Sequence, residues 1–173
     1  MKTLLARLTA PLFAAALAHA APATPVTPVP SVDLNRYLGS WYEIAHLPMF
    51  FQRHCLADTT ATYSLLGDSR IGVLNRCRTA KGVDQAKGKA RVMKDSGNAR
   101  LKVTFFWPFS GDYWVIGLDP DYRWAVVGEP RRKYLWILSR TPVLPPGQLE
   151  AARQAALAQG YDLSGLITTP QNP

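Results

Sequence analysis

The chain has few of the residues from which metal sites and hydrolytic active sites are built. It contains two cysteines and three histidines, with no Cys-x-x-Cys or His-x-x-x-His spacing, so it lacks the ligand spacing of a structural zinc site. It also lacks a Gly-x-Ser-x-Gly motif and a paired set of carboxylates, which are signatures of nucleophilic and acid–base catalysis. We therefore expect neither catalytic residues nor a bound metal or cofactor.

Long blocks of one charge are missing as well. The formal charge is +8, yet the longest basic run is Arg131-Arg132-Lys133. Nucleic-acid-binding proteins concentrate basic residues far more than this, so a nucleic acid is not expected as a partner. The basic excess is either a solvated surface or an attraction for an anionic ligand or membrane.

No apolar run is long enough to span a bilayer. Lys2 and Arg7 precede a short apolar run over residues 8–17, and Ala18-His19-Ala20 follows as a small-residue cleavage site. This pattern predicts a signal peptide over residues 1–20, so we expect an exported, periplasmic or outer-membrane-associated protein. An alanine rather than a cysteine follows the cleavage site, which predicts no lipid anchor. Residues 21–32 are rich in proline and are expected to be an extended linker, with one domain over residues 33–173.

What the chain does contain is a regular series of alternating apolar and polar residues. Ala57, Ala61 and Tyr63 alternate with threonines and a serine, and the same pattern returns after each turn signal. Strands are predicted over Trp41–Leu47, Ala57–Leu66, Ile71–Cys77, Gln85–Val92, Leu101–Phe105, Tyr113–Leu118, Trp124–Glu129 and Tyr134–Arg140. The predicted fold is all-β: an eight-stranded antiparallel up-and-down barrel.

The last strands are apolar on both faces, which requires a cover on the outside of the barrel. One helix is predicted, over residues 146–159, beginning at Pro146 and ending before Gly160. Leu149, Ala152 and Ala156 form its apolar stripe, so we expect it to pack outside the barrel.

The first and last strands of such a barrel meet at one end. Trp41 and Arg140 are expected to make a cation–π contact that closes this end, with Gly39 and Tyr122 as further structural residues there. The loops at the opposite, open end contain aromatic and cationic side chains. The predicted rim residues are Phe50, Phe51, Trp107, Arg131 and Arg132.

Three ordered motifs resemble those of the lipocalin family. Residues 33–45 contain Gly39-Ser-Trp41-Tyr-Glu43, residues 114–122 contain Asp119-Pro-Asp-Tyr122, and residues 134–142 end in Ser-Arg140-Thr-Pro. Within that family, the chain resembles the bacterial outer-membrane type related to apolipoprotein D and the plant temperature-induced lipocalins. The resemblance implies binding of a fatty acid, lysophospholipid or similar amphiphile, and a role in membrane maintenance under stress.

Side chains alternate between the two faces of a strand, and this alternation (strand parity) predicts which of them point into the barrel and would contact that ligand. The predicted ligand-binding residues are Ala61, Tyr63, Val73, Asn75, Val103, Phe105, Tyr113 and Trp136. Ala86, Gly88 and Ala90 are small and are expected to leave space for the ligand. Asn75 could instead pair with Tyr113, and Glu43 is expected to bond to backbone or tyrosine near the closed end.

The sequence is compatible with alternatives for the cysteines, the barrel interior and the activity. Cys55 and Cys77 form either one disulfide, as export favours, or two buried free thiols. The barrel could be filled by its own side chains, which would leave a module that docks to a partner or to an anionic membrane. A lipocalin-type isomerase would need a perturbed inward group such as Glu43 or His46.

Overall fold

The computed structural model describes residues 24–67 and 70–172 and contains the predicted barrel. The strands and helices are α1 (Leu34–Tyr37), β1 (Gly39–His46), the 3-10 helix η1 (Phe50–Gln52), β2 (Ala57–Leu66), β3 (Arg70–Thr79), β4 (Gly82–Val92), β5 (Arg100–Phe106), β6 (Phe109–Leu118), β7 (Trp124–Gly128), β8 (Leu135–Ser139), α2 (Pro146–Ala158) and β9 (Ile167–Thr168). The predicted signal peptide lies outside the described residues.

Each strand from β2 to β8 pairs antiparallel with the next, and β1 closes the ring by pairing with both β8 and β2. The eight-stranded up-and-down barrel is thus confirmed, with β9 added beside β1. The sequence pattern missed β9 because a two-residue strand has no measurable periodicity.

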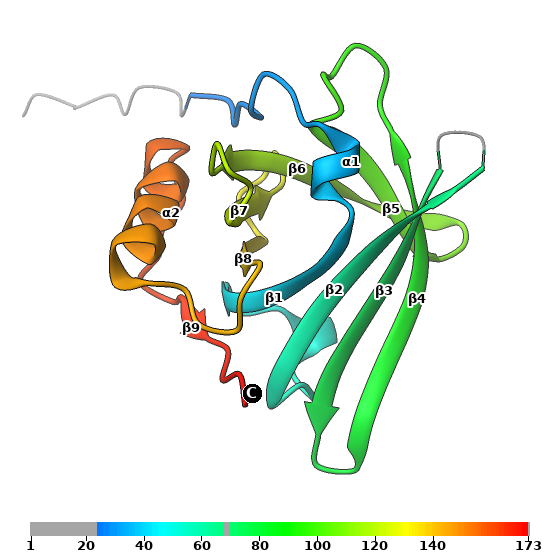
Figure 1. Cartoon of the computed structure of the whole chain (residues 1–173), viewed down its shortest axis with the longest axis vertical. Coiled ribbons are helices and arrows are strands. Elements are labelled where there is room, and N and C mark those ends of the chain that lie inside the picture. The colour runs from blue at the N-terminus through cyan, green and yellow to red at the C-terminus, as the bar shows by residue number, and fades with distance from the viewer. Residues whose placement is uncertain (1–23, 68–69, 173) are drawn as a thin grey trace, which may run out of the picture.

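The apolar residues form two cores, one on each side of the barrel wall. Inside lie Trp41, Tyr63, Val73 and Leu101 among others. Outside, Ile137 and Val126 pack with Ala152 and Ala156 of α2. Figure 1 shows α2 alongside β7, on the outside of the sheet. The apolar character of both faces of the last strands is therefore explained by the helix, as expected.

The segment before the barrel is extended and lies against it. Val29 N–H donates to Val115 O at 2.8 Å and Val32 N–H to Gly97 O at 2.7 Å, while the Val26 and Val32 side chains are buried. Asp33 then begins α1, where its carboxylate accepts a hydrogen bond from Asn35 N–H. None of the helices in residues 24–67 and 70–172 combines the length and apolarity needed to cross a bilayer.

The wall is incompletely paired at β4. This strand pairs with β3 along its whole length but with β5 only over Lys89–Val92. In Figure 1 the lower ends of β2, β3 and β4 extend together well beyond β5. The residues of β4 before Lys89 therefore form the part of the wall where the barrel opens.

The C-terminal segment closes a second gap, between β1 and β2. Thr169 N–H donates to Ile44 O, and Pro170 O accepts from Asp58 N–H. The Gln171 side-chain amide donates to the carbonyls of Glu43 and Thr59. The chain end thus hydrogen-bonds to both strands at the place where they have separated.

Candidate functional site

The closed end is built around Trp41. Its ring is fully buried, its indole N–H donates to Tyr37 O at 2.8 Å, and the Arg140 guanidinium carbon lies 3.8 Å from the ring centroid. Gly39 has a φ of +89°, which favours glycine. The Tyr122 hydroxyl accepts from Asp33 N–H at 2.8 Å. The four predicted closed-end residues therefore lie at the same end of the barrel.

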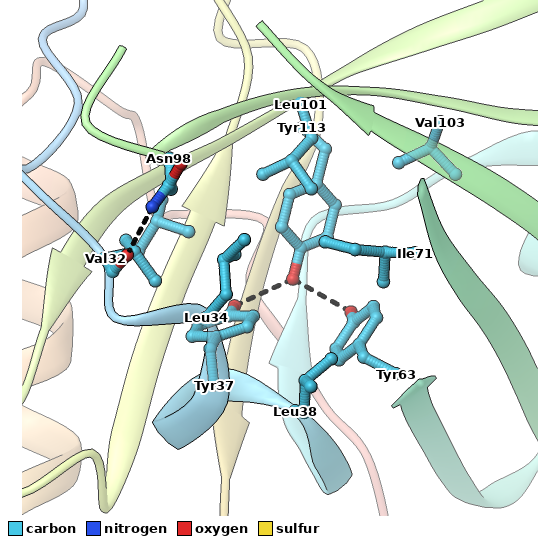
Figure 2. A pocket seen from close by; sticks show the side chains of 11 residues that line it. Val32, Leu34, Tyr37, Leu38, Tyr63, Ile71, Asn98, Leu101, Val103 and Tyr113 are labelled. Atoms are coloured by element: carbon cyan, nitrogen blue, oxygen red, sulfur yellow. Dashed lines mark hydrogen bonds between the residues drawn. The ribbon is translucent and has the colours of Figure 1, made fainter. Parts of the chain in front are cut away.

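Three tyrosines form the floor of the barrel interior. The Tyr113 hydroxyl bonds to the hydroxyls of Tyr37 and Tyr63, each at 2.8 Å, and Figure 2 shows the three groups converging. Burial raises the pKa of Tyr63 to about 12 and that of Tyr37 and Tyr113 well above the ordinary value. These phenols stay protonated at neutral pH and serve as hydrogen-bonding groups, not as bases.

Little space is left in the barrel interior beside the three tyrosines. The cavity beside the tyrosines has a volume of about 10 Å³, which is about the room that one water needs. Tyr63 and Val73 are buried in the inner core. The predicted ligand residues Tyr63, Val73 and Tyr113 therefore form the bottom of the interior, and any space for a larger molecule lies nearer the open end.

A row of small and polar side chains lies above the floor. Ala61, Asn75 and Ala86 are register partners across β2, β3 and β4, and all three face the interior by parity. Ala61 and Asn75 are half-buried and Ala86 is exposed. Inward side chains that remain exposed show that solvent reaches the interior at this level.

Asn75 has an unsatisfied oxygen in this row. Its Oδ1 is buried and accepts no hydrogen bond from any residue in the described part of the chain. The expected alternative, pairing with Tyr113, is wrong because the Tyr113 hydroxyl bonds to two other tyrosines. Buried acceptors are normally paired, so Asn75 is an inner residue with capacity for a ligand donor.

The expectation that Gly88 leaves space is also wrong. A Cβ at Gly88 would lie 2.8 Å from the Phe105 ring and 2.9 Å from the Thr104 carbonyl oxygen. Phe105 thus occupies the room that the glycine provides. Ala90 is buried in the inner core, which leaves Ala86 as the small residue of β4 with open space. Val103 and Phe105 are half-buried on β5.

A polar network connects the open end to β1. The Gln52 amide of η1 donates to both carboxylate oxygens of Glu43 at 2.8 and 2.7 Å, and Thr169 Oγ donates to Glu43 Oε1 at 2.6 Å. The Trp136 indole N–H reaches Gln52 Oε1 at 3.4 Å. Glu43 therefore bonds to side chains from η1 and the C-terminal segment, and the expected bond to backbone or to a tyrosine is wrong.

Burial dominates the chemistry of Glu43. The side chain is 3% exposed, and desolvation raises its carboxyl pKa above the ordinary value, although His46, at 3.9 Å, opposes this. The carboxylate already accepts three hydrogen bonds from neighbouring side chains. This arrangement holds η1 against β1, and both carboxylate oxygens already accept a hydrogen bond.

The two cysteines are joined. Cys55 and Cys77 form a disulfide with a Cα–Cα distance of 5.5 Å, so the alternative of free thiols is wrong. A bulge in β2 after Ala57, with Asp58 at φ +56°, shifts the register so that Ala57 lies opposite Arg78. His54 lies near both sulfurs, but bonded cysteines offer no thiolate to a metal.

The predicted rim residues divide into two groups. Phe50, Phe51 and Trp107 are 68%, 46% and 88% exposed, and the Arg131 side chain is exposed beside Glu129. The Arg132 guanidinium instead donates to Gln159 O, at the end of α2, and to Thr24 O. Arg132 thus connects the N-terminal segment to the helix.

Four residues that form hydrogen bonds in this site were not predicted from the sequence: Tyr37, Gln52, Thr169 and Gln171. Tyr37 lies within the first motif, four residues before Trp41, and its place in that motif is the signal that could have marked it. The other three lie in segments without periodicity, so no pattern indicated that they bond to β1.

Comparison with known proteins places this barrel in a family. A family model described as a lipocalin-like domain matches residues 32–171. Outer membrane lipoprotein Blc of Escherichia coli is 42% identical over 170 residues, covering 97% of this chain and 96% of that protein. Temperature-induced lipocalin-1 of Arabidopsis thaliana is 41% identical, covering 83% of this chain and 82% of that protein. Apolipoprotein D of mouse is 33% identical, covering 80% and 77%.

Solved structures give the same fold. Insecticyanin from the tobacco hornworm Manduca sexta superposes with a TM-score of 0.70 at 23% identity, covering 87% of each chain. Lobster apocrustacyanin A1 superposes with a TM-score of 0.66 at 16% identity, covering 88% of this chain and 93% of that one. At these identities the likeness concerns the fold alone.

Proposed function

The chain belongs to the lipocalin family, and on that premise we propose that it binds one small amphiphilic lipid inside the barrel, such as a fatty acid or a lysophospholipid. The observation that supports this most is the solvent exposure of inward residues above the tyrosine floor, including Ala61, Asn75 and Ala86. A barrel filled to its rim would bury them.

The wall chemistry suits an acyl chain. Val103, Phe105 and Trp136 present apolar, half-buried surfaces to the interior, and burial of each methylene gains about 0.8 kcal/mol, offset by the cost of association. The Asn75 oxygen would accept a hydrogen bond from a hydroxyl, amide or ammonium of the ligand. The ligand would rest on the tyrosine floor and extend toward the open end.

We propose that the protein carries its lipid ligand and does not catalyse a reaction on it. Catalysis would need an inward acid or base with a free proton-accepting atom. Glu43, the inward carboxyl group with a raised pKa, has both oxygens hydrogen-bonded to Gln52 or Thr169. The isomerase alternative therefore gains no support from the arrangement of this carboxylate.

The proposed location is the cell envelope, where the protein would help maintain membranes under stress. The relative from Escherichia coli is called an outer membrane lipoprotein, and the N-terminal sequence has the charge and apolar pattern of an export signal. Because this chain has Ala21 after the predicted cleavage site, we propose export without a lipid anchor. Absence of labelled palmitate from the protein in a producing cell would support that part; its incorporation would contradict it.

The open end is proposed to touch an anionic membrane during loading and release. Phe50 and Trp107 are highly exposed aromatic residues there, and aromatic rings favour the interface between headgroups and acyl chains. This contact is the second candidate function, and it does not depend on an empty barrel.

Native mass spectrometry of the exported protein, purified without detergent, tests the carrier proposal. We expect a population with the mass of one added lipid, which organic extraction should remove and an added lysophospholipid should restore. A protein that carries no lipid, and takes up none from a panel of fatty acids and lysophospholipids, would contradict it and leave the membrane contact as the remaining function.

A further inference from the structure

The outer face of β3, β4 and β5 carries an unusual concentration of positive charge. Basic residues on these strands are Arg70, Arg76, Arg78, Lys87, Lys89, Arg91, Arg100 and Lys102, against a single acid, Asp84. Because Ile71, Val73 and Ala90 face the inner core, alternation places all eight basic side chains outward. These basic residues therefore belong to the outer wall and not to the barrel interior.

Part of this face is hollowed. A concavity of about 290 Å³ lies over β3 to β6, lined among others by Arg70, Lys89, Arg91, Lys102, Thr104 and Ser110. Four cations and two hydroxyl groups thus surround one space. Guanidinium and ammonium groups with hydroxyl donors are the set that binds phosphate oxygens.

The strand register brings like charges together around the hollow. Arg70 is the direct partner of Arg91, and Arg91 is the direct partner of Lys102. Like charges in opposite positions of a sheet repel each other. Asp112 forms an ion pair with Lys102 at 2.7 Å, whereas Lys89 and Arg91 have no ion-pair partner within residues 24–67 and 70–172. An anion in the hollow would relieve this repulsion.

The hollow adjoins an exposed aromatic hairpin. Ser110, in its lining, directly follows Phe109, and Phe106, Trp107 and Phe109 are 78%, 88% and 78% exposed. Aromatic side chains next to clustered cations are typical of proteins that lie at an anionic bilayer surface, with rings between the lipids and cations at the headgroups. The combination favours a lipid phosphate over a phosphate free in solution.

We propose that the hollow on the outer wall is a binding site for the phosphate groups of anionic membrane phospholipids. This inference rests on the membrane contact proposed above, and it assigns the headgroup contact to the wall beside the β5–β6 hairpin instead of to the rim arginines. A lipid held here is separate from the ligand proposed to bind inside the barrel, because the two sites lie on opposite faces of the same strands.

The test compares two pairs of substitutions with the same change in charge. Lys89→Ser with Arg91→Ser alters the lining of the hollow. Arg76→Ser with Lys87→Ser removes two exposed cations from the same outer face, outside the lining. Circular dichroism verifies that both variants fold. Co-sedimentation is measured with phosphatidylcholine vesicles and with vesicles that also contain phosphatidylglycerol.

We expect the unaltered protein to sediment with the phosphatidylglycerol vesicles and much less with phosphatidylcholine alone. Because Lys89 and Arg91 line the hollow and Arg76 and Lys87 do not, the hollow pair should lose about tenfold or more in affinity, and the control pair distinctly less. Equal losses in both pairs would overturn the site and leave a diffuse basic surface. Failure of the unaltered protein to bind either vesicle would contradict the membrane contact itself.

Competition identifies the source of the phosphate. Soluble glycerol phosphate at constant ionic strength should displace the protein from vesicles only weakly, because it brings one phosphate and no apolar surface. Tight binding of soluble glycerol phosphate, sensitive to the Lys89 and Arg91 changes but without vesicle binding, would overturn the membrane assignment in favour of a free phosphate ligand.

Discussion

The Arg140 guanidinium lies 3.8 Å from the centroid of the Trp41 ring, and donates to Ser40 O at 2.9 Å and to Arg36 O. One side chain of the segment after β8 thus covers the indole of β1 and hydrogen-bonds to two backbone carbonyls that precede Trp41 in the chain. The contact closes the barrel where its first and last strands meet, and so forms the fixed end on which the tyrosine floor rests.

Removal of either partner should destabilise the barrel. Trp41→Ala should cost about 3–5 kcal/mol of unfolding free energy as a large-to-small change in a buried site. Arg140→Ala should also destabilise, because two backbone carbonyls lose their donor. Arg140→Lys, the control, should recover part of the loss, since it keeps a cation but not the planar fork. Urea unfolding gives these values; unchanged stability in both alanine variants would show that the contact is incidental.

The disulfide between Cys55 and Cys77 should stabilise the open-end loop. The bonded residues are separated by 22 positions, and a loop of that size contributes about 3 kcal/mol by restricting the unfolded chain. Replacement of both cysteines by alanine should lower the unfolding free energy by about this amount. The unreduced, denatured protein should take up no thiol reagent, and uptake of two equivalents would contradict the bridge.

Tyr113 should matter more than Tyr63 to the floor. Tyr113→Phe breaks two hydroxyl bonds and leaves the buried hydroxyls of Tyr37 and Tyr63 unpaired, whereas Tyr63→Phe breaks one. An unpaired buried group costs about 1–3 kcal/mol. Equilibrium unfolding should therefore rank Tyr113→Phe as the more destabilising change, and the reverse order would refute the role of Tyr113 as the shared partner.

Glu43 should make stability depend on pH in a recognisable direction. Its folded-state pKa lies above the ordinary value of 4.5, so the folded protein binds more protons than the unfolded chain between these two pKa values. Stability from this group is present below 4.5 and is lost as pH rises toward the folded-state pKa. The unfolding free energy of the unaltered protein minus that of Glu43→Gln should consequently decrease as pH rises. A difference independent of pH would contradict the raised pKa.

The wall of the barrel was predictable because the earlier strands alternate apolar and polar residues, and turn residues separate all eight. Ala57–Leu66 was predicted with the bounds that β2 has, and Trp41 and Arg140 follow from the closure of an even-numbered meander. Side-chain parity also placed Ala61, Asn75 and Val103 on the inner face.

Parity could not show which inward residues leave space. Whether Gly88 of β4 leaves space in the interior depends on the position of the Phe105 ring of β5. Whether Tyr63 contacts a ligand depends on Tyr37, which comes from the segment before the barrel. The Glu43 network likewise depends on Gln52 and Thr169, in segments without periodic sequence. These contacts are set by tertiary packing, which a single-strand pattern does not contain.

The most direct test of the carrier account is a titration of lysophospholipid followed by tryptophan emission, with Ala86→Phe compared with Gln85→Phe. The two positions are neighbours on β4 and face opposite sides of the wall; Ala86 lies in the inner row opposite Asn75. We predict saturable binding of one lipid per protein, loss of this binding in Ala86→Phe, and binding in Gln85→Phe like that of the unaltered protein. Undiminished binding in Ala86→Phe, or no binding by any of the three, would contradict a ligand in the barrel.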